Sequence, residues 1–184
     1  MEVVALVLSG ISLVVAAVGT VLSNRRSSEA LAESRKAATT ALWSDTQEAI
    51  QRLIGFDPAS ESAGERLANL RIAMIALVDE LGWDGFDQWL DTERSLGACL
   101  GQQVMDRARP GDTVDERLKV LDAYHRWAQV LGMNLRVFRS QGYDKAVASG
   151  LRDHAADQMK RVCEANGWQL PPTTIPGLRP LDGQ

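Results

Sequence analysis

The amino-acid sequence predicts an all-α protein: one N-terminal transmembrane helix that continues into a long cytoplasmic helix, followed by a compact antiparallel bundle of about four helices. Three observations predict this. Val3–Ser23 is a run of twenty-one residues without a charged side chain. Four later segments repeat apolar residues at helical spacing, and a Gly or a turn follows each of them. Outside the N-terminal segment, no run of β-branched and aromatic residues alternates with the period of two that marks a strand.

The N-terminal segment, residues 1–24, is expected to be a membrane anchor. A helix of about 20 apolar residues crosses a bilayer core roughly 30 Å thick. A cleavable signal peptide begins with positive charge, whereas the one charge before Val3 is Glu2. A retained span is therefore favoured, and a cleaved signal and a buried core helix stay open as alternatives. Arg25 and Arg26 follow the span, so the positive-inside rule predicts an outside N-terminus and a cytoplasmic C-terminal domain at the inner membrane of a bacterial cell.

Small side chains form a stripe along this segment. On a helical wheel they fall in a sector roughly 100° wide that holds no bulky residue. We call them the small-residue stripe: Ala5, Ser9, Ser12, Ala16, Gly19, Thr20 and Ser23. Such a face lets the backbones of two membrane helices approach closely. The stripe therefore predicts a helix-packing interface, with another copy of the chain or with a different protein; the alternative is that small residues are simply tolerated there.

A juxtamembrane helix, residues 25–57, is expected to continue the span. No Gly or Pro lies between Thr20 and Ile54. Gly55, expected in a left-handed cap, and Pro58 are predicted to stop the helix. Near its end a new apolar face is suited to docking on the bundle, and it holds Leu31, Leu42, Trp43, Ile50, Leu53 and Ile54.

The bundle is expected over residues 58–168, where each helix has local start or stop signals. One helix ends at Gly82, and the next starts at Asp84. Thr113 with Glu116 three residues later is a capping box for a third helix, and Asp144 caps a fourth. The inward faces are expected to hold Leu67, Leu70, Met74, Leu77, Val78, Leu81, Phe86, Trp89, Leu90, Leu96, Leu100, Val104, Leu118, Leu121, Tyr124, Ala128, Leu131, Leu135, Phe138, Val147, Leu151, Ala155, Met159 and Val162. A Pro- and Gly-rich tail, 169–184, is expected to be extended or disordered.

Acidic residues cluster between Ile72 and Glu93, a stretch without a single basic residue. The cluster comprises Asp79, Glu80, Asp84, Asp87, Asp91 and Glu93. Carboxylates from one helix form a poor cage for a hard cation. We therefore expect the cluster to pair with the base-rich stretch, which contains Arg126, Arg136, Arg139, Lys145, Arg152, Lys160 and Arg161.

Histidine and cysteine do not match a known site. His125 is expected at the edge of the core with one hydrogen bond, and the spacing of Cys99, His125, His154 and Cys163 fits no zinc motif. A Cys99–His125 nucleophile pair has no local signature. The two cysteines suit either one disulfide or two buried thiols in a reducing compartment.

The sequence therefore predicts an interaction module more readily than an enzyme. It holds no Gly-rich phosphate loop and no hydrolase, zinc-protease or dinucleotide motif, so no catalytic residue, cofactor or metal is assigned. The net charge of −4 and the absence of a basic patch argue against nucleic acid. The expected partners are the lipid bilayer, a second copy through the transmembrane helix, and an unknown cytoplasmic protein. A membrane-tethered enzyme without a motif and an accessory subunit of a larger membrane complex are the alternatives.

Overall fold

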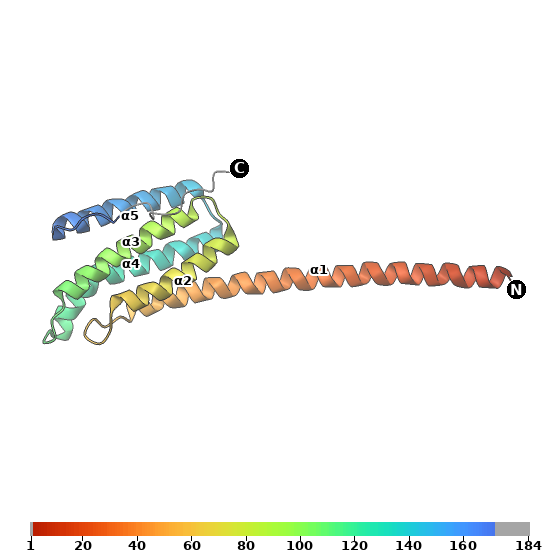
Figure 1. Ribbon diagram of the computed structural model, residues 1–184, viewed down its shortest axis with the longest axis horizontal. Helices are drawn as coiled ribbons and strands as arrows, with labels where there is room; N and C mark the ends of the chain where they lie inside the picture. The colour runs from red at the N-terminus through yellow and green to blue at the C-terminus, as the bar shows by residue number, and fades with distance from the viewer. Residues whose placement is uncertain (1, 172–184) are drawn as a thin grey trace, which may run out of the picture. The chain divides into compact units, whose positions relative to one another are not determined.

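The protein is all-α over the part that the structure describes. A computed structural model describes the backbone of residues 2–171 and the side chains of residues 27–171. Within these residues there are five helices and no strand, in the order α1 (Glu2–Ile54), α2 (Ala63–Leu81), α3 (Phe86–Arg107), α4 (Val114–Gln141) and α5 (Lys145–Asn166) (Figure 1). The chain divides into two compact units between Ala41 and Leu42. The prediction for the tail lies outside the described residues from Pro172 onward.

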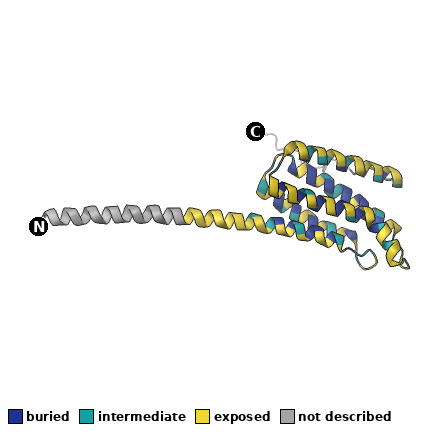
Figure 2. Cartoon of the chain, turned by 180° about the vertical axis from the view of Figure 1, so that it is seen from behind, coloured by how far each residue is buried: buried dark blue, intermediate teal, exposed yellow. Residues whose placement is uncertain are grey.

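In the first unit, the described side chains of α1 are exposed to solvent. Residues 27–41 are exposed on every side of the helix apart from Thr39, which is partly covered (Figure 2). Leu31 is 62% exposed, so its expected place on a docking face is wrong. Thr39 and Thr40 donate their hydroxyl hydrogens to the carbonyls of Arg35 and Lys36, one helical turn back. This stretch therefore buries no apolar face of its own.

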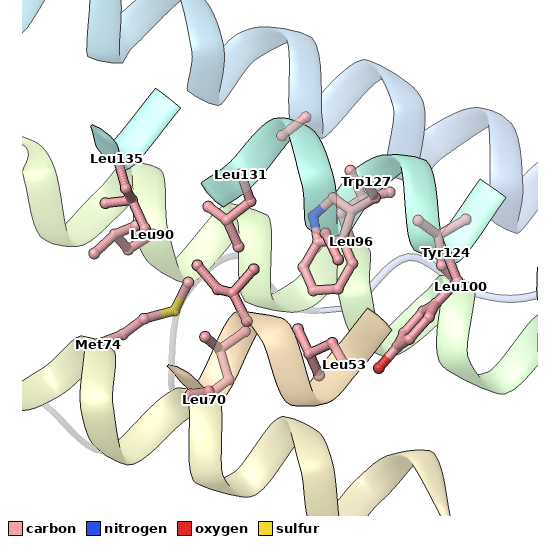
Figure 3. Packing of buried hydrophobic residues seen from close by; sticks show 14 of the residues in the cluster. Leu53, Leu70, Met74, Leu90, Leu96, Leu100, Tyr124, Trp127, Leu131 and Leu135 are labelled. Carbon is pink, nitrogen blue, oxygen red and sulfur yellow. The ribbon is translucent and has the colours of Figure 1, made fainter. Parts of the chain in front are cut away.

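The second unit is a helical bundle that begins with the last turns of α1. Ile50 and Leu53 are completely buried in it, as their predicted face requires. Leucines and aromatic rings from α1 to α4 meet in the core shown in Figure 3, where Leu53, Leu70 and Leu131 are labelled. The bundle is therefore built from five helical segments, with the end of α1 as one of them.

Helix α3 is the centre of the bundle. It packs against α2, α4 and α5. Lys145 pairs with Asp84 near the start of α5, and the sulfurs of Cys163 and Cys99 meet near its end. Helices α3 and α5 therefore run in the same direction, which is what two consecutive antiparallel connections produce.

Helix ends follow the predicted local chemistry. The Thr113 hydroxyl accepts the Glu116 N–H while the Glu116 carboxylate accepts the Thr113 N–H, so the capping box is confirmed. Asp144 accepts the N–H groups of Ala146 and Val147 at the start of α5. Gly82, with φ +57°, closes α2 in the left-handed conformation that favours glycine.

Two predicted helix ends are wrong in detail. Gly55 does not take the left-handed conformation, because Phe56 continues a tight turn by donating to the Leu53 carbonyl at 3.2 Å. Helix α3 begins at Phe86 and not at Asp84, because Gly85 (φ +79°) forms its N-cap. The Asp84 carbonyl instead accepts the Tyr143 hydroxyl at 2.7 Å.

Two predicted core residues lie on the surface. Leu118 and Val147 are 54% and 50% exposed. Val147 is exposed because α5 has few neighbours. Of helices α2, α3 and α4, only α3 packs against it. A helix that packs against a single neighbour buries only a narrow row of its side chains. In α5 this row consists of Ala148, Ala155, Met159 and Cys163.

Gly97 of α3 packs tightly against the Trp127 ring of α4. A Cβ atom on Gly97 would lie 2.2 Å from the Trp127 ring, and the Trp127 indole is fixed by a hydrogen bond to Glu93. We therefore expect Gly97→Ala to lower the free energy of unfolding by about 2–3 kcal/mol, because overpacking outweighs the helix propensity gained. Urea unfolding measures this value.

Gly150 in α5 supplies the matched control. It is exposed, and a Cβ atom there would meet nothing within 4 Å. Gly150→Ala should raise the free energy of unfolding by about 0.5–1 kcal/mol. If Gly97→Ala stabilised the protein as much as Gly150→Ala, this would contradict the tight contact between Gly97 and the Trp127 ring.

Candidate functional site

The predicted membrane interface belongs to the N-terminal part of α1. Every residue of the small-residue stripe, together with Arg25 and Arg26, lies outside the residues whose side chains are described. Their backbone belongs to α1. Among the described side chains, no helix contains a stretch long and apolar enough to cross a bilayer.

Two grooves flank α5 in the bundle. The α2–α5 groove lies over α3 and has a volume of about 710 Å³. Its apolar lining comes from three helices and comprises Met74, Ile75, Val78, Leu90, Ala156 and Met159. Its charged lining comprises Arg71, Asp79, Asp87, Asp91, Arg94 and Arg152.

The α4–α5 groove lies on the other side of α5, with a volume of about 390 Å³. Leu96, Val130 and Leu151 supply part of its apolar lining, and Arg126 and Arg161 are basic residues along it. Glu93 and Trp127 line it as well, although both are buried. A buried carboxyl group beside a groove is the least expected feature of the bundle.

Glu93 is held by two tryptophans. The Trp89 indole donates to one carboxylate oxygen at 3.0 Å, and the Trp127 indole donates to the other at 2.9 Å. The side chain of Glu93 is only 6% exposed. Burial raises the pKa of this carboxyl group, while the two indole hydrogen bonds and the charge of His154 act in the opposite direction.

The predicted pairing of the acidic cluster is confirmed in one place and wrong in another. Asp84 forms an ion pair with Lys145, as expected for the base-rich stretch. Glu93 is bound to indoles, because its position on α3 faces the interior at Trp127. Asp91 pairs with Arg94 of its own helix at 2.7 Å. Among the described residues, no group of three or more potential ligands could hold a metal ion.

The histidines occupy unrelated surroundings. His154 is exposed, and its Nε2 lies 2.8 Å from the Gln158 amide nitrogen. His125 is half-buried, which fits its expected place at the edge of the core, and its Nε2 has no hydrogen-bond partner. Burial lowers the pKa of His125, and Asp122 partly opposes this change. A lowered pKa favours the neutral imidazole.

The cysteines come together in the bundle. The sulfur atoms of Cys99 and Cys163 lie 3.8 Å apart, and both residues are buried free thiols. Burial, and then the hydrogen bond to Cys163, raise the pKa of Cys99 to about 12. A catalytic cysteine needs the opposite shift, because the thiolate is the nucleophile. Cys99 is therefore not an activated nucleophile in this arrangement.

Sequence reasoning missed the cluster of Glu93 with two tryptophans. Trp89 and Glu93 are four residues apart and share a helix face, which was a usable signal. Trp127 lies 34 residues from Glu93, and only the tertiary fold shows which carboxylate its indole meets.

Comparison with known proteins gives no relative. No protein-family model, no curated protein sequence and no solved structure matches this chain.

Replacing Glu93 by Gln tests the buried carboxyl group. The Gln oxygen accepts one indole N–H, but its amide group cannot accept the other. At pH 4.5 we expect Glu93→Gln to lower the free energy of unfolding by about 1–3 kcal/mol. Because the pKa of Glu93 is raised in the folded protein, ionisation of its carboxyl group costs stability. The free energy of unfolding of the wild-type protein should therefore fall as pH rises above the ordinary glutamate range and through the folded-state pKa.

The difference between wild type and Glu93→Gln should therefore shrink as pH rises from 4.5 to 8, measured by urea unfolding at each pH. Glu65→Gln, at an exposed position in α2, is the control for removing a carboxylate. A difference that stays constant or grows with pH would contradict the raised pKa of Glu93.

Proposed function

We propose that this chain is a membrane-anchored protein whose helical bundle binds another protein in the cytoplasm. The observation that carries the proposal is the uncharged segment Val3–Ser23 at the start of α1. Twenty-one helical residues at 1.5 Å each extend about 32 Å, which matches the hydrocarbon core of a bilayer. Arg25 and Arg26 would hold the following chain on the cytoplasmic side.

The small-residue stripe supports assembly within the membrane. In lipid, helices associate through close packing and hydrogen bonds, and small residues permit both. Ser9, Ser12 and Thr20 also supply hydroxyl groups that can bond across the contact. We propose that a second copy of the chain packs on this stripe.

The exposed stretch 27–41 supports a role in binding and spacing. A helix whose side chains are exposed gains no stability from burial of its own, and every residue of this stretch apart from Thr39 is exposed. A bound partner or a spacer role would account for it. The bundle contributes a separate core, so binding at the membrane and folding of the bundle do not depend on the same residues.

The ionisable groups inside the bundle favour binding over catalysis. The Glu93 carboxyl group is fully bonded by two indoles, and Cys99 faces another thiol. A general base or nucleophile must instead reach a substrate. The raised pKa values of Glu93 and Cys99 therefore belong to groups that pack and bond within the core.

Single-cysteine crosslinking in membranes tests the anchor and the stripe together. Cysteines at Ser9, Ser12 and Ala16, in a chain with Cys99 and Cys163 replaced by Ser, should crosslink two copies several-fold more than cysteines at Leu6, Leu13 and Val18. The second set lies outside the sector that the stripe occupies and is the control. The yield of covalent dimer on a denaturing gel is the measurement.

Two results would count against the proposal. Equal yields from the two sets would reject self-assembly through the stripe. Release of the protein into the aqueous phase by alkaline carbonate would reject the membrane span. Crosslinks from the stripe to a different membrane protein, with none between copies, would favour an accessory subunit instead.

A further inference from the structure

Cys99 and Cys163 place their thiol groups side by side in the bundle. Cys99 lies on α3 and Cys163 in the last turns of α5. Their sulfur atoms are 3.8 Å apart, and the side chains are 8% and 1% exposed. In the reduced protein, one thiol donates a weak hydrogen bond to the other.

We propose that these two thiols form an intramolecular disulfide on exposure to a small-molecule disulfide, and that this bond fastens α5 to α3. A disulfide requires a sulfur–sulfur distance of about 2.05 Å, so each sulfur must move by roughly 0.9 Å. Rotation about the Cα–Cβ bonds supplies movement of this size. The parallel course of α3 and α5 also keeps the two residues at the same level of the bundle.

The reaction is a thiol–disulfide exchange in two steps. The sulfur of one cysteine attacks the small-molecule disulfide and forms a mixed disulfide, and one small-molecule thiol leaves. The second cysteine then attacks its partner's sulfur, and the second small-molecule thiol leaves. Two electrons pass from the protein to the reagent, and the two cysteine protons end on the two released thiols.

Access to the sulfurs controls the rate. The raised pKa of Cys99 leaves little thiolate near neutral pH, and neither side chain is open to solvent. Cys163, however, lies in the last turn of α5. Its carbonyl accepts the Trp168 N–H at 2.9 Å, and Gly167 closes the helix with φ +69°. Opening this last turn exposes Cys163 without unfolding α3.

The neighbourhood favours a disulfide over other fates of a thiol pair. A metal site needs further ligands, and no group of three or more potential ligands occurs among the described residues. The contact also lies where α5 has its one helix partner among α2 to α5. A disulfide here closes a loop of the chain between residues 99 and 163. It also fixes α5, which lines both grooves.

The test oxidises the full-length chain in detergent micelles with oxidised glutathione. The product should be a monomer that has lost about 2 Da, with a tryptic peptide that joins Cys99 to Cys163. Oxidative refolding from urea should give the same species. Because the bond closes a long loop, the urea midpoint of the oxidised form should rise by on the order of 1 M.

Cys99→Ser and Cys163→Ser, each with one thiol left, are the matched controls and should show neither the 2 Da loss nor the shifted midpoint. Far-ultraviolet circular dichroism verifies that each variant is folded. The proposal is overturned if both thiols of the wild-type protein remain open to alkylation after oxidation and unfolding. It is also overturned if the oxidised product is mainly a dimer, or if the oxidised monomer unfolds at lower urea than the reduced one.

Discussion

The Glu93 carboxyl group fixes the positions of the two tryptophans on which the bundle core depends. One of its oxygens accepts the Trp89 indole and the other accepts the Trp127 indole. The absence of a side chain at Gly97 leaves room for the Trp127 ring against α3. Rotation of either indole would leave a buried carboxyl oxygen without its donor, which is unfavourable in a low-dielectric interior. Each ring therefore has one acceptable orientation.

From these two rings, aromatic contacts extend through the whole core. Trp127 lies 5.5 Å from Tyr124, which in turn meets Phe56 after the end of α1. On the other side, the ring centroids of Trp89 and Phe138 lie 5.3 Å apart. Phe138 in turn contacts Tyr143 just before α5, and Tyr143 stacks on Trp83 in the α2–α3 turn. Such pairs add about 0.5–1.5 kcal/mol each beyond the burial of their surface. These aromatic contacts thus connect Glu93 to the α1–α2, α2–α3 and α4–α5 connections of the bundle.

The helices could be predicted from sequence because local chemistry decides them. Gly82, Asp144 and the Thr113 capping box act within a few residues, and the structure confirms each. The burial of Glu93 could not be predicted, because a carboxylate in an acidic stretch looks like a solvated residue until the indole of Trp127 is placed beside it. The exposure of Val147 was hidden for a related reason: helical spacing shows which residues share a face, but not how many neighbours that face will meet.

The attachment of α5 explains why the two ends of this helix behave differently. Its buried row is narrow and contains two alanines, so it removes less apolar surface from water than the faces of α3 or α4. At its start, the Lys145–Asp84 pair is exposed and orients the helix more than it stabilises it. At its end, the sulfur atoms of Cys99 and Cys163 are buried. A helix held along one narrow face opens more readily than the centre of the core. The grooves on both sides of α5 therefore change together whenever this helix moves, and the contact between Cys99 and Cys163 is the point at which such movement can be stopped by a covalent bond.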